Sequence, residues 1–137
     1  MVRPIVKDRL FLSLKSEEAT KEDLPIGKDL LDTVRHYSDC CVGLAANSIG
    51  IRKRIIALSL HPLELIMYNP VIVKKEKPYT TTEKCLSLGE TETTVTRYET
   101  IEVEFRDTSF VKRRAEFVKL VAEVIQHEAD HLDGIVV

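Results

Sequence analysis

The segment from Gln126 to Gly134 holds two histidines and a glutamate whose spacing could bind a metal and activate water. His127 and His131 are four positions apart, so on a helix both imidazoles lie one turn apart and can reach a single ion. Glu128 lies about 100° further round the helix, near enough to reach a water at the metal without being a ligand. This HExxH spacing is typical of metallohydrolases. The alternative interpretation is a helix that carries two incidental histidines.

A third ligand is expected upstream of this segment. Only six residues follow His131, and Asp133 points away from the histidine pair if the helix continues. The candidates are an acidic residue or one of five others: His36, Cys40, Cys41, His61 and Cys85. His36 is expected on the polar side of a helix and His61 in a turn, and a free cysteine is often simply buried. Cys85 is favoured, because it lies in EKCLSLGE with Glu83 before it and a glycine after it.

The elements that must position these residues are a helix, several strands and a final helix. Apolar residues at three- and four-residue steps predict the first helix, and strict alternation predicts a half-buried strand through Ile101, Val103 and Phe105. The predicted segments are a polar loop over 15–25, a helix from Lys28 to about Cys40, a strand from Ile55 to Leu60, a strand within LIMYNPVIVK interrupted at Asn69–Pro70, a turn at 107–109 and a helix from about Val118 to Leu132 that Gly134 terminates. This order predicts an α+β fold with antiparallel β-sheets packed around the C-terminal HExxH helix, in one domain over residues 1–137.

Composition narrows the classes of function. The chain is 44% hydrophobic and 31% charged, with a formal net charge of −2, which argues against direct nucleic-acid binding. Neither a secretory signal nor a membrane-spanning run is evident, so no membrane partner is expected. Three cysteines, two of them adjacent, make a poor disulfide framework and favour a reducing cytoplasm.

Three ordered motifs resemble the peptide deformylase family. GLAANSIG at 43–50 is similar to the family's GxGLAAxQxG, EKCLS at 83–87 resembles EGCLS, and QHEADHLDG at 126–134 matches QHExDHLxG closely. The similarity extends from residue 8 to the end of the chain. Three motifs in the right order are far more specific than HExxH alone.

The resemblance implies removal of the formyl group from the N-terminal formylmethionine of new bacterial proteins. It implies one divalent metal, ferrous iron in the native protein with zinc or nickel as substitutes, held by Cys85, His127 and His131. Glu128 would transfer protons, and the oxyanion would be stabilised by the backbone N–H of Leu86 and by the residue at position 48. The substrate-binding residues would be Gly43, Leu44, Ala45, Glu83 and Lys84. The implied partners are N-formylmethionyl nascent chains and the ribosome.

Four positions depart from the family pattern. Ser48 replaces the Gln whose side-chain amide donates to the oxyanion, and loss of such a donor typically costs about 10²–10³ in rate. Lys84 replaces a Gly, Gly89 replaces a Pro, and Glu92 replaces an Arg that many members carry. The alternatives are therefore a relative that acts on other N-acyl peptides, or a metal-retaining peptide-binding protein. Asp130 is expected either to orient a ligating imidazole or to be solvated, and Arg97 to pair with a nearby acid.

Overall fold

The computed structural model describes residues 1–89 and 91–137. The elements, in chain order, are α1 (Arg9–Leu12), η1 (Lys21–Asp23), α2 (Leu24–His36), β1 (Gly43–Ala45), η2 (Ala46–Ile49), β2 (Ile55–Leu60), β3 (Leu63–Lys84), η3 (Leu86–Leu88), β4 (Glu92–Arg106), β5 (Lys112–Val118) and α3 (Lys119–Leu132). None of the described helices is long and apolar enough to cross a membrane.

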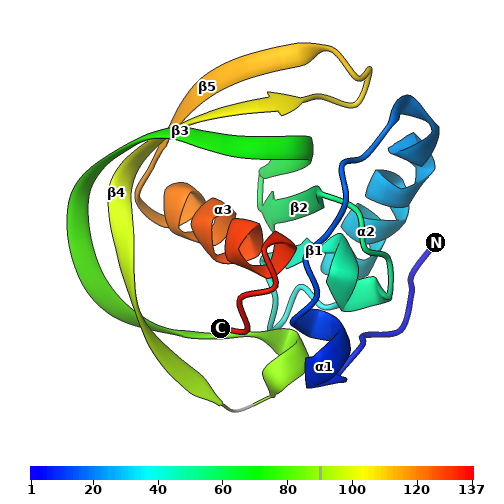
Figure 1. Ribbon diagram of the computed structural model, residues 1–137, viewed down its shortest axis with the longest axis horizontal. Helices are drawn as coiled ribbons and strands as arrows, with labels where there is room; N and C mark the ends of the chain where they lie inside the picture. Colours follow the sequence, from blue (N-terminus) through cyan, green and yellow to red (C-terminus); the bar gives the residue numbers. More distant parts are fainter. Residues whose placement is uncertain (90) are drawn as a thin grey trace.

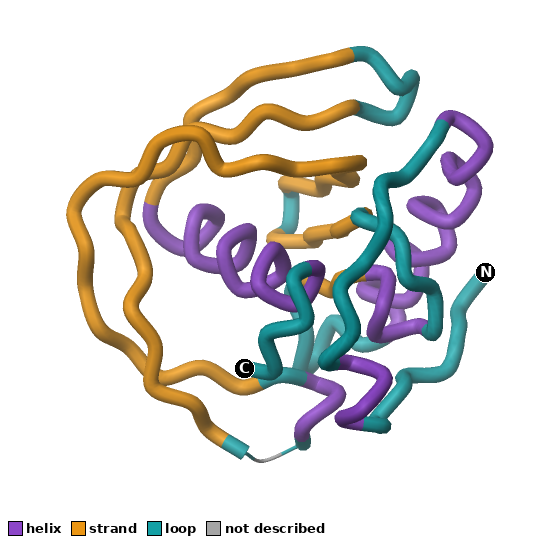
Figure 2. Tube along the Cα trace, in the orientation of Figure 1, coloured by secondary structure: helices purple, strands orange, loops and turns teal. Residues whose placement is uncertain are grey.

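The five strands form one antiparallel sheet in the order β1-β2-β3-β4-β5. Strands β3 and β4 form a long curved hairpin. The sheet bends around α3, which lies on its concave side (Figures 1 and 2). Helix α2 lies on the other side of β1 and β2 (Figure 1). The predicted α+β class with an antiparallel sheet around the last helix is confirmed.

Strand β2 is buried on both faces because helices cover both of its sides. Ile56 and Leu58 belong to the apolar cluster that includes Ile125 of α3, whereas Ile55 and Ala57 belong to the cluster that includes Leu30 of α2. Successive side chains of a strand point to opposite faces, so this alternation builds two cores from one strand. Full burial of one such aliphatic side chain stabilises the fold by about 1.5–3 kcal/mol. One core packs α3 against β1 and β2, and the other packs α2 against the same two strands.

Helix α2 begins and ends four residues before the predicted limits, at Leu24 and His36. Pro25 lies in its first turn, where the missing N–H costs no helical hydrogen bond. The prediction treated this proline as part of a loop and was wrong there. The buried face of α2 carries Leu30 and Val34, as its spacing predicted.

The predicted interruption of the third strand is a β-bulge within one continuous strand. Asn69 has φ of 53°, and the register of β3 against β4 shifts between Tyr68 and Val71. The Asn69 side chain pairs with the backbone of Ala19, accepting from its N–H at 2.7 Å and donating to its carbonyl at 2.9 Å. A short polar side chain tolerates positive φ, and an extra residue bends the strand without ending it.

The predicted limits of β2, of the turn at 107–109 and of α3 are confirmed within one residue. The half-buried strand predicted through Ile101, Val103 and Phe105 is part of the longer β4, and β3 continues past the predicted segment to Lys84. Strand β2 spans Ile55–Leu60, and the turn at 107–109 joins β4 to β5 through hydrogen bonds from the backbone N–H groups of Ser109 and Val111 to the Asp107 carboxylate. Helix α3 spans Lys119–Leu132, and Gly134 follows it with φ of 77°. Positive φ is the conformation in which glycine commonly ends a helix.

Candidate metal centre and adjoining pocket

The three predicted ligands converge. One side-chain donor atom each from Cys85, His127 and His131 lies within 4.8 Å of the others, and all three residues are buried. The two imidazole centroids are 4.5 Å apart. Cys85 follows the end of β3, so the curved hairpin delivers the sulfur to the helix that carries both histidines. The upstream ligand is thus distant from both histidines in sequence but adjacent to them in space.

Close packing holds α3 in this position. Gly43 of β1 lies so near α3 that an added Cβ would be 2.7 Å from Cγ1 of Val124 and 3.3 Å from the carbonyl oxygen of Ala57. Gly43 therefore serves close approach rather than a turn, whereas Gly50, with φ of 85°, ends η2 in a turn. At the C-terminal end of α3, the Asn47 side-chain amide donates to the carbonyl of His131 at 3.0 Å.

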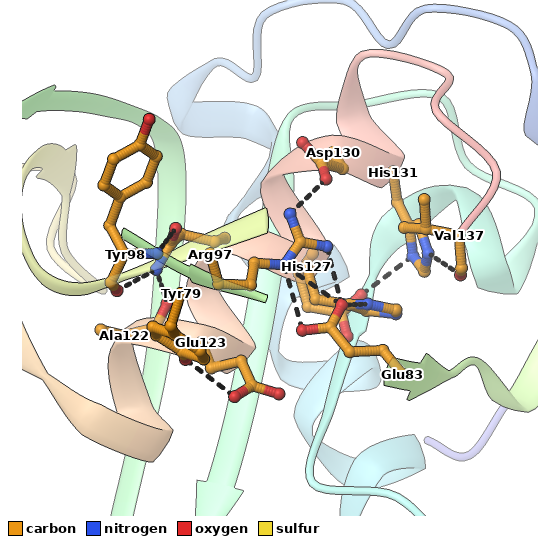
Figure 3. A network of polar contacts seen from close by, with 12 residues as sticks. Tyr79, Glu83, Arg97, Tyr98, Ala122, Glu123, His127, Asp130, His131 and Val137 are labelled. Atoms are coloured by element: carbon orange, nitrogen blue, oxygen red, sulfur yellow. Dashed lines mark hydrogen bonds and ion pairs between the residues drawn. The ribbon is translucent and has the colours of Figure 1, made fainter. Parts of the chain in front are cut away.

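A buried ion-pair network fixes the orientation of His127 (Figure 3). Nδ1 of His127 lies 2.7 Å from Oε1 of Glu83, which leaves Nε2 for a metal. Arg97 donates to both carboxylate oxygens of Glu83 at 2.7–3.1 Å and to Asp130 at 2.6 Å. Arg97 is 4% exposed. The predicted pairing of Arg97 with an acid is present twice, and Asp130 contacts this arginine.

The network sets the charge of its members. Burial disfavours the Glu83 carboxylate, but His127 and Arg97 outweigh it and lower its pKa to about 2. Burial likewise disfavours charge on His127, yet hydrogen bonds with Cys85 and Glu83 raise its pKa to about 9 in the metal-free protein. An ionised Glu83 therefore holds the imidazole in a fixed orientation.

The sulfur and the buried glutamate are also ionised. Burial raises the pKa of a thiol, but His127 and His131 hydrogen-bond to Cys85 and lower its pKa to about 6. Burial opposes charge on Glu128 too, and the positive charge of His131 nevertheless lowers its pKa. Oε1 of Glu128 lies 3.1 Å from Nδ1 of His131 but has no hydrogen-bond partner among the described residues. It is thus a buried carboxylate oxygen able to accept a proton.

These side chains fit a divalent transition metal. One thiolate and two imidazoles are ligands that suit iron, nickel, cobalt and zinc, and three protein ligands leave a position for water or substrate. The thiolate form of Cys85 is already favoured before any ion binds. Glu83 behind His127 supplies the carboxylate partner that metal-ligating histidines usually have.

A pocket of about 280 Å³ opens beside Cys85, His127 and Glu128. Its apolar wall includes the exposed Leu120, which continues the stripe of His127 and Val124 along α3. The other lining residues are Cys40, Cys41, Val42, Gly43, Leu44, Thr82, Glu83, Lys84, Leu86 and Glu123. This volume is enough for an amino-acid side chain and a length of peptide backbone.

The residues predicted to bind substrate or assist catalysis divide into two groups. Gly43, Leu44, Glu83, Lys84 and Leu86 line the pocket together with Cys85, His127 and Glu128. Ala45 and Ser48 are fully buried and do not contribute to its lining.

Sequence reasoning missed the bond between the Tyr79 hydroxyl and Glu123, at 2.8 Å, and the role of Glu83 as partner of His127. Glu123 lies four residues before His127, so helical periodicity alone could have placed it at the pocket.

Two of the four departures from the family pattern face each other. Lys84 and Glu92 are register partners across β3 and β4, with an N–O distance of 3.8 Å. Gly89 has φ of 64°, a conformation closed to proline, whose ring fixes φ near −65°. Lys84 and Glu92 therefore pair where β3 ends and β4 begins.

Comparison with known proteins agrees with this geometry. A family model described as polypeptide deformylase matches residues 5–137. A peptide deformylase of Clostridium beijerinckii is 53% identical over 137 residues and covers 100% of both chains. The solved peptide deformylase of Thermus thermophilus is 34% identical, with a TM-score of 0.90 over 98% of this chain and 83% of that one. A class I type b peptide deformylase of Acinetobacter baumannii, solved with Met-Ala-Ser bound, is 25% identical, with a TM-score of 0.89 over 99% and 96% of the two chains.

Proposed function

Because this chain belongs to the peptide deformylase family, whose members are metal-dependent hydrolases that remove the N-formyl group from new proteins, we propose that Cys85, His127, His131 and Glu128 perform this reaction. The observation that carries the proposal is the convergence of three buried ligand atoms with a buried, ionised glutamate at one end of a pocket. The native metal is ferrous iron, and zinc or nickel can replace it.

Each residue has a defined task. When bound, the cation would lower the pKa of a neighbouring water, so that this water could lose a proton and act as a nucleophile near neutral pH. Glu128 accepts the proton of the attacking water and returns it to the amine nitrogen as the carbon–nitrogen bond breaks, which releases formate. The backbone N–H of Leu86, next to Cys85, donates to the oxygen that becomes negative. Glu83, Arg97 and Asp130 act through His127 by holding its ring.

The substrate is an N-formylmethionyl peptide. Its backbone lies beside Gly43 and Leu44 of the edge strand β1, and the methionine side chain contacts Leu120 and Val124. The Met-Ala-Ser complex of the Acinetobacter relative supports a peptide as ligand. New chains leaving the ribosome in the cytoplasm present this end first.

The direct test is formate release from formyl-Met-Ala-Ser by the iron- or nickel-loaded protein. We expect turnover in the wild type and a loss of at least about 10²-fold in Glu128→Gln, because the isosteric amide cannot accept the proton. Metal content should stay unchanged in this variant. Glu116→Gln, the same substitution at an exposed residue of β5, serves as the matched control and should retain full activity. Turnover in Glu128→Gln equal to the wild type would refute the assignment of the base.

A further inference from the structure

A second, much smaller cavity adjoins Cys85. Cys85 is the residue that it shares with the peptide pocket among the described linings. Asn47, Ser48 and His131 are the polar residues among those that line it. The rest of the lining is apolar and consists of Leu12, Leu88, Ile135 and Val136.

Two buried polar atoms of these lining residues have no hydrogen-bond partner among the described residues. They are Oγ of Ser48 and Oδ1 of Asn47, and both residues are fully buried. The amide nitrogen of Asn47 is already engaged, because it donates to the carbonyl of His131 at 3.0 Å. A buried polar group without a partner is costly, and buried water commonly satisfies such groups with about three hydrogen bonds.

The size of the cavity restricts what it can hold. The space for the centre of a water molecule is about 10 Å³, which is close to the minimum for one water. An organic ligand does not fit. The two unpartnered oxygens and the Cys85 sulfur also match one water, which can accept one bond from a hydroxyl and donate two.

We propose that this cavity binds one water molecule that accepts a hydrogen bond from Ser48 and donates to Oδ1 of Asn47 and to the Cys85 thiolate. The inference rests on the proposed function in taking Cys85 as a metal ligand. Hydrogen bonds to a ligating sulfur withdraw electron density from it and tune the bound metal. Ser48 is then a positioning residue that acts on the metal thiolate through water.

This role differs from the one that the family resemblance implies for position 48. A direct oxyanion donor has to face the substrate pocket, and Ser48 does not line it. Replacement of a direct donor would lower kcat and leave the metal–sulfur bond untouched. Replacement of a residue that holds a water on the sulfur would change that bond.

The experiment uses the cobalt(II)-loaded full-length protein and follows the sulfur-to-cobalt charge-transfer absorption. In Ser48→Ala we expect this band to move to longer wavelength, because loss of a hydrogen bond raises the energy of the sulfur lone pairs. Ser16→Ala is the matched control: its hydroxyl is also buried and without a described partner, but Ser16 lines neither cavity. Its band should coincide with the wild type.

An unchanged band in Ser48→Ala, or an equal shift in Ser16→Ala, would overturn the inference. A high-resolution crystal structure of the wild type gives a second reading, since no density in the cavity within hydrogen-bond distance of Ser48 would also overturn it. A band that shifts in a protein unable to release formate would uphold the water site and reject the proposed function. A wild type without any sulfur-to-cobalt band would reject Cys85 as ligand and the inference with it.

Discussion

Glu83 and Lys84 are neighbours on strand β3, yet their ion pairs lie in contrasting surroundings. The Glu83 and Arg97 side chains are 7% and 5% exposed, and the guanidinium bonds both oxygens of the carboxylate. The Lys84 and Glu92 side chains are 51% and 59% exposed and are separated by 3.8 Å. Alternation along a strand sends one side chain towards α3 and the next towards solvent.

The contrast shows that an ion pair has a different role in the interior and at the surface. In the interior, each charge has to be paired, so the Glu83–Arg97 pair fixes a ligand with little freedom to vary. At the surface, water screens the charges, so residues of the Lys84–Glu92 pair can be replaced at small cost to stability. Lys84 and Glu92, two positions at which this chain departs from its family, form that outer pair.

The largest effect on stability is expected from Arg97→Ala. Removal of the guanidinium leaves Glu83 buried with one of its two charged partners gone, and breaking a buried pair typically costs about 3–5 kcal/mol. Denaturant unfolding of the metal-free protein measures the loss. Arg114→Ala removes a surface arginine that pairs with Glu102 and Glu104, and should cost far less stability, because water screens exposed ion pairs. Equal losses in the two variants would contradict the distinction between inner and outer pairs.

Metal removal separates the contribution of the ion from that of the network. The two apolar cores lie around α2 and α3 and do not include the ligand histidines, so we expect the chelated protein to remain folded. Its free energy of unfolding should fall by about 2.7 kcal/mol relative to protein with metal at a hundred times Kd. Urea unfolding with and without chelator measures this difference in the free energy of unfolding. In His127→Ala, which lacks a ligand, the chelator should change the free energy of unfolding very little. Loss of helical circular dichroism on chelation would instead assign the metal a structural role.

Glu83→Gln is expected to lower the affinity of the protein for metal. Glu83→Gln keeps an oxygen that can accept from Nδ1 of His127 but removes the charge that makes the ring a better ligand. Such partners of ligating histidines typically account for about 10–100-fold in affinity. Competition with a chromogenic chelator gives the Kd, and Glu116→Gln again provides the control. An unchanged Kd would mean that packing alone orients the imidazole.

The inner network also shows what could be predicted from the sequence. The three ligands were predictable because HExxH contains two of them and the EKCLS motif contains Cys85. Helix α3 and strand β2 were predictable because the spacing of their apolar residues reflects burial. The contact between Glu83 and His127 could not be predicted. Glu83 lies close to Cys85 in the sequence and was expected to face the substrate, and only the position of β3 against α3 shows its contact with His127. Arg97 was expected near an acid, but nothing in its sequence neighbourhood identified Glu83 and Asp130 as the two.

The long β3–β4 hairpin shows why other parts could not be predicted. Residues 74–84 are almost entirely polar, so they carry no alternation, and their strand exists through pairing with residues 92–102. The bulge at Asn69 depends on Ala19, fifty residues away in sequence. The cavity beside Ser48 is a property of packing between distant segments, and the prediction of one domain over residues 1–137 stays a prediction.

The smallest effect is expected from the outer pair itself. A double-mutant cycle with Lys84→Ala and Glu92→Ala isolates the interaction between these two residues, whatever else either one contacts. We expect a coupling free energy of about 0.2–1 kcal/mol at low salt, and less at high ionic strength, because both side chains are largely solvated. Exchanging the charges with Lys84→Glu and Glu92→Lys together should preserve this coupling, since the register that pairs the positions is set by the backbone. A coupling of several kcal/mol that salt does not reduce would show that the rim is as rigidly organised as the interior, and the distinction between the two ion pairs would fail.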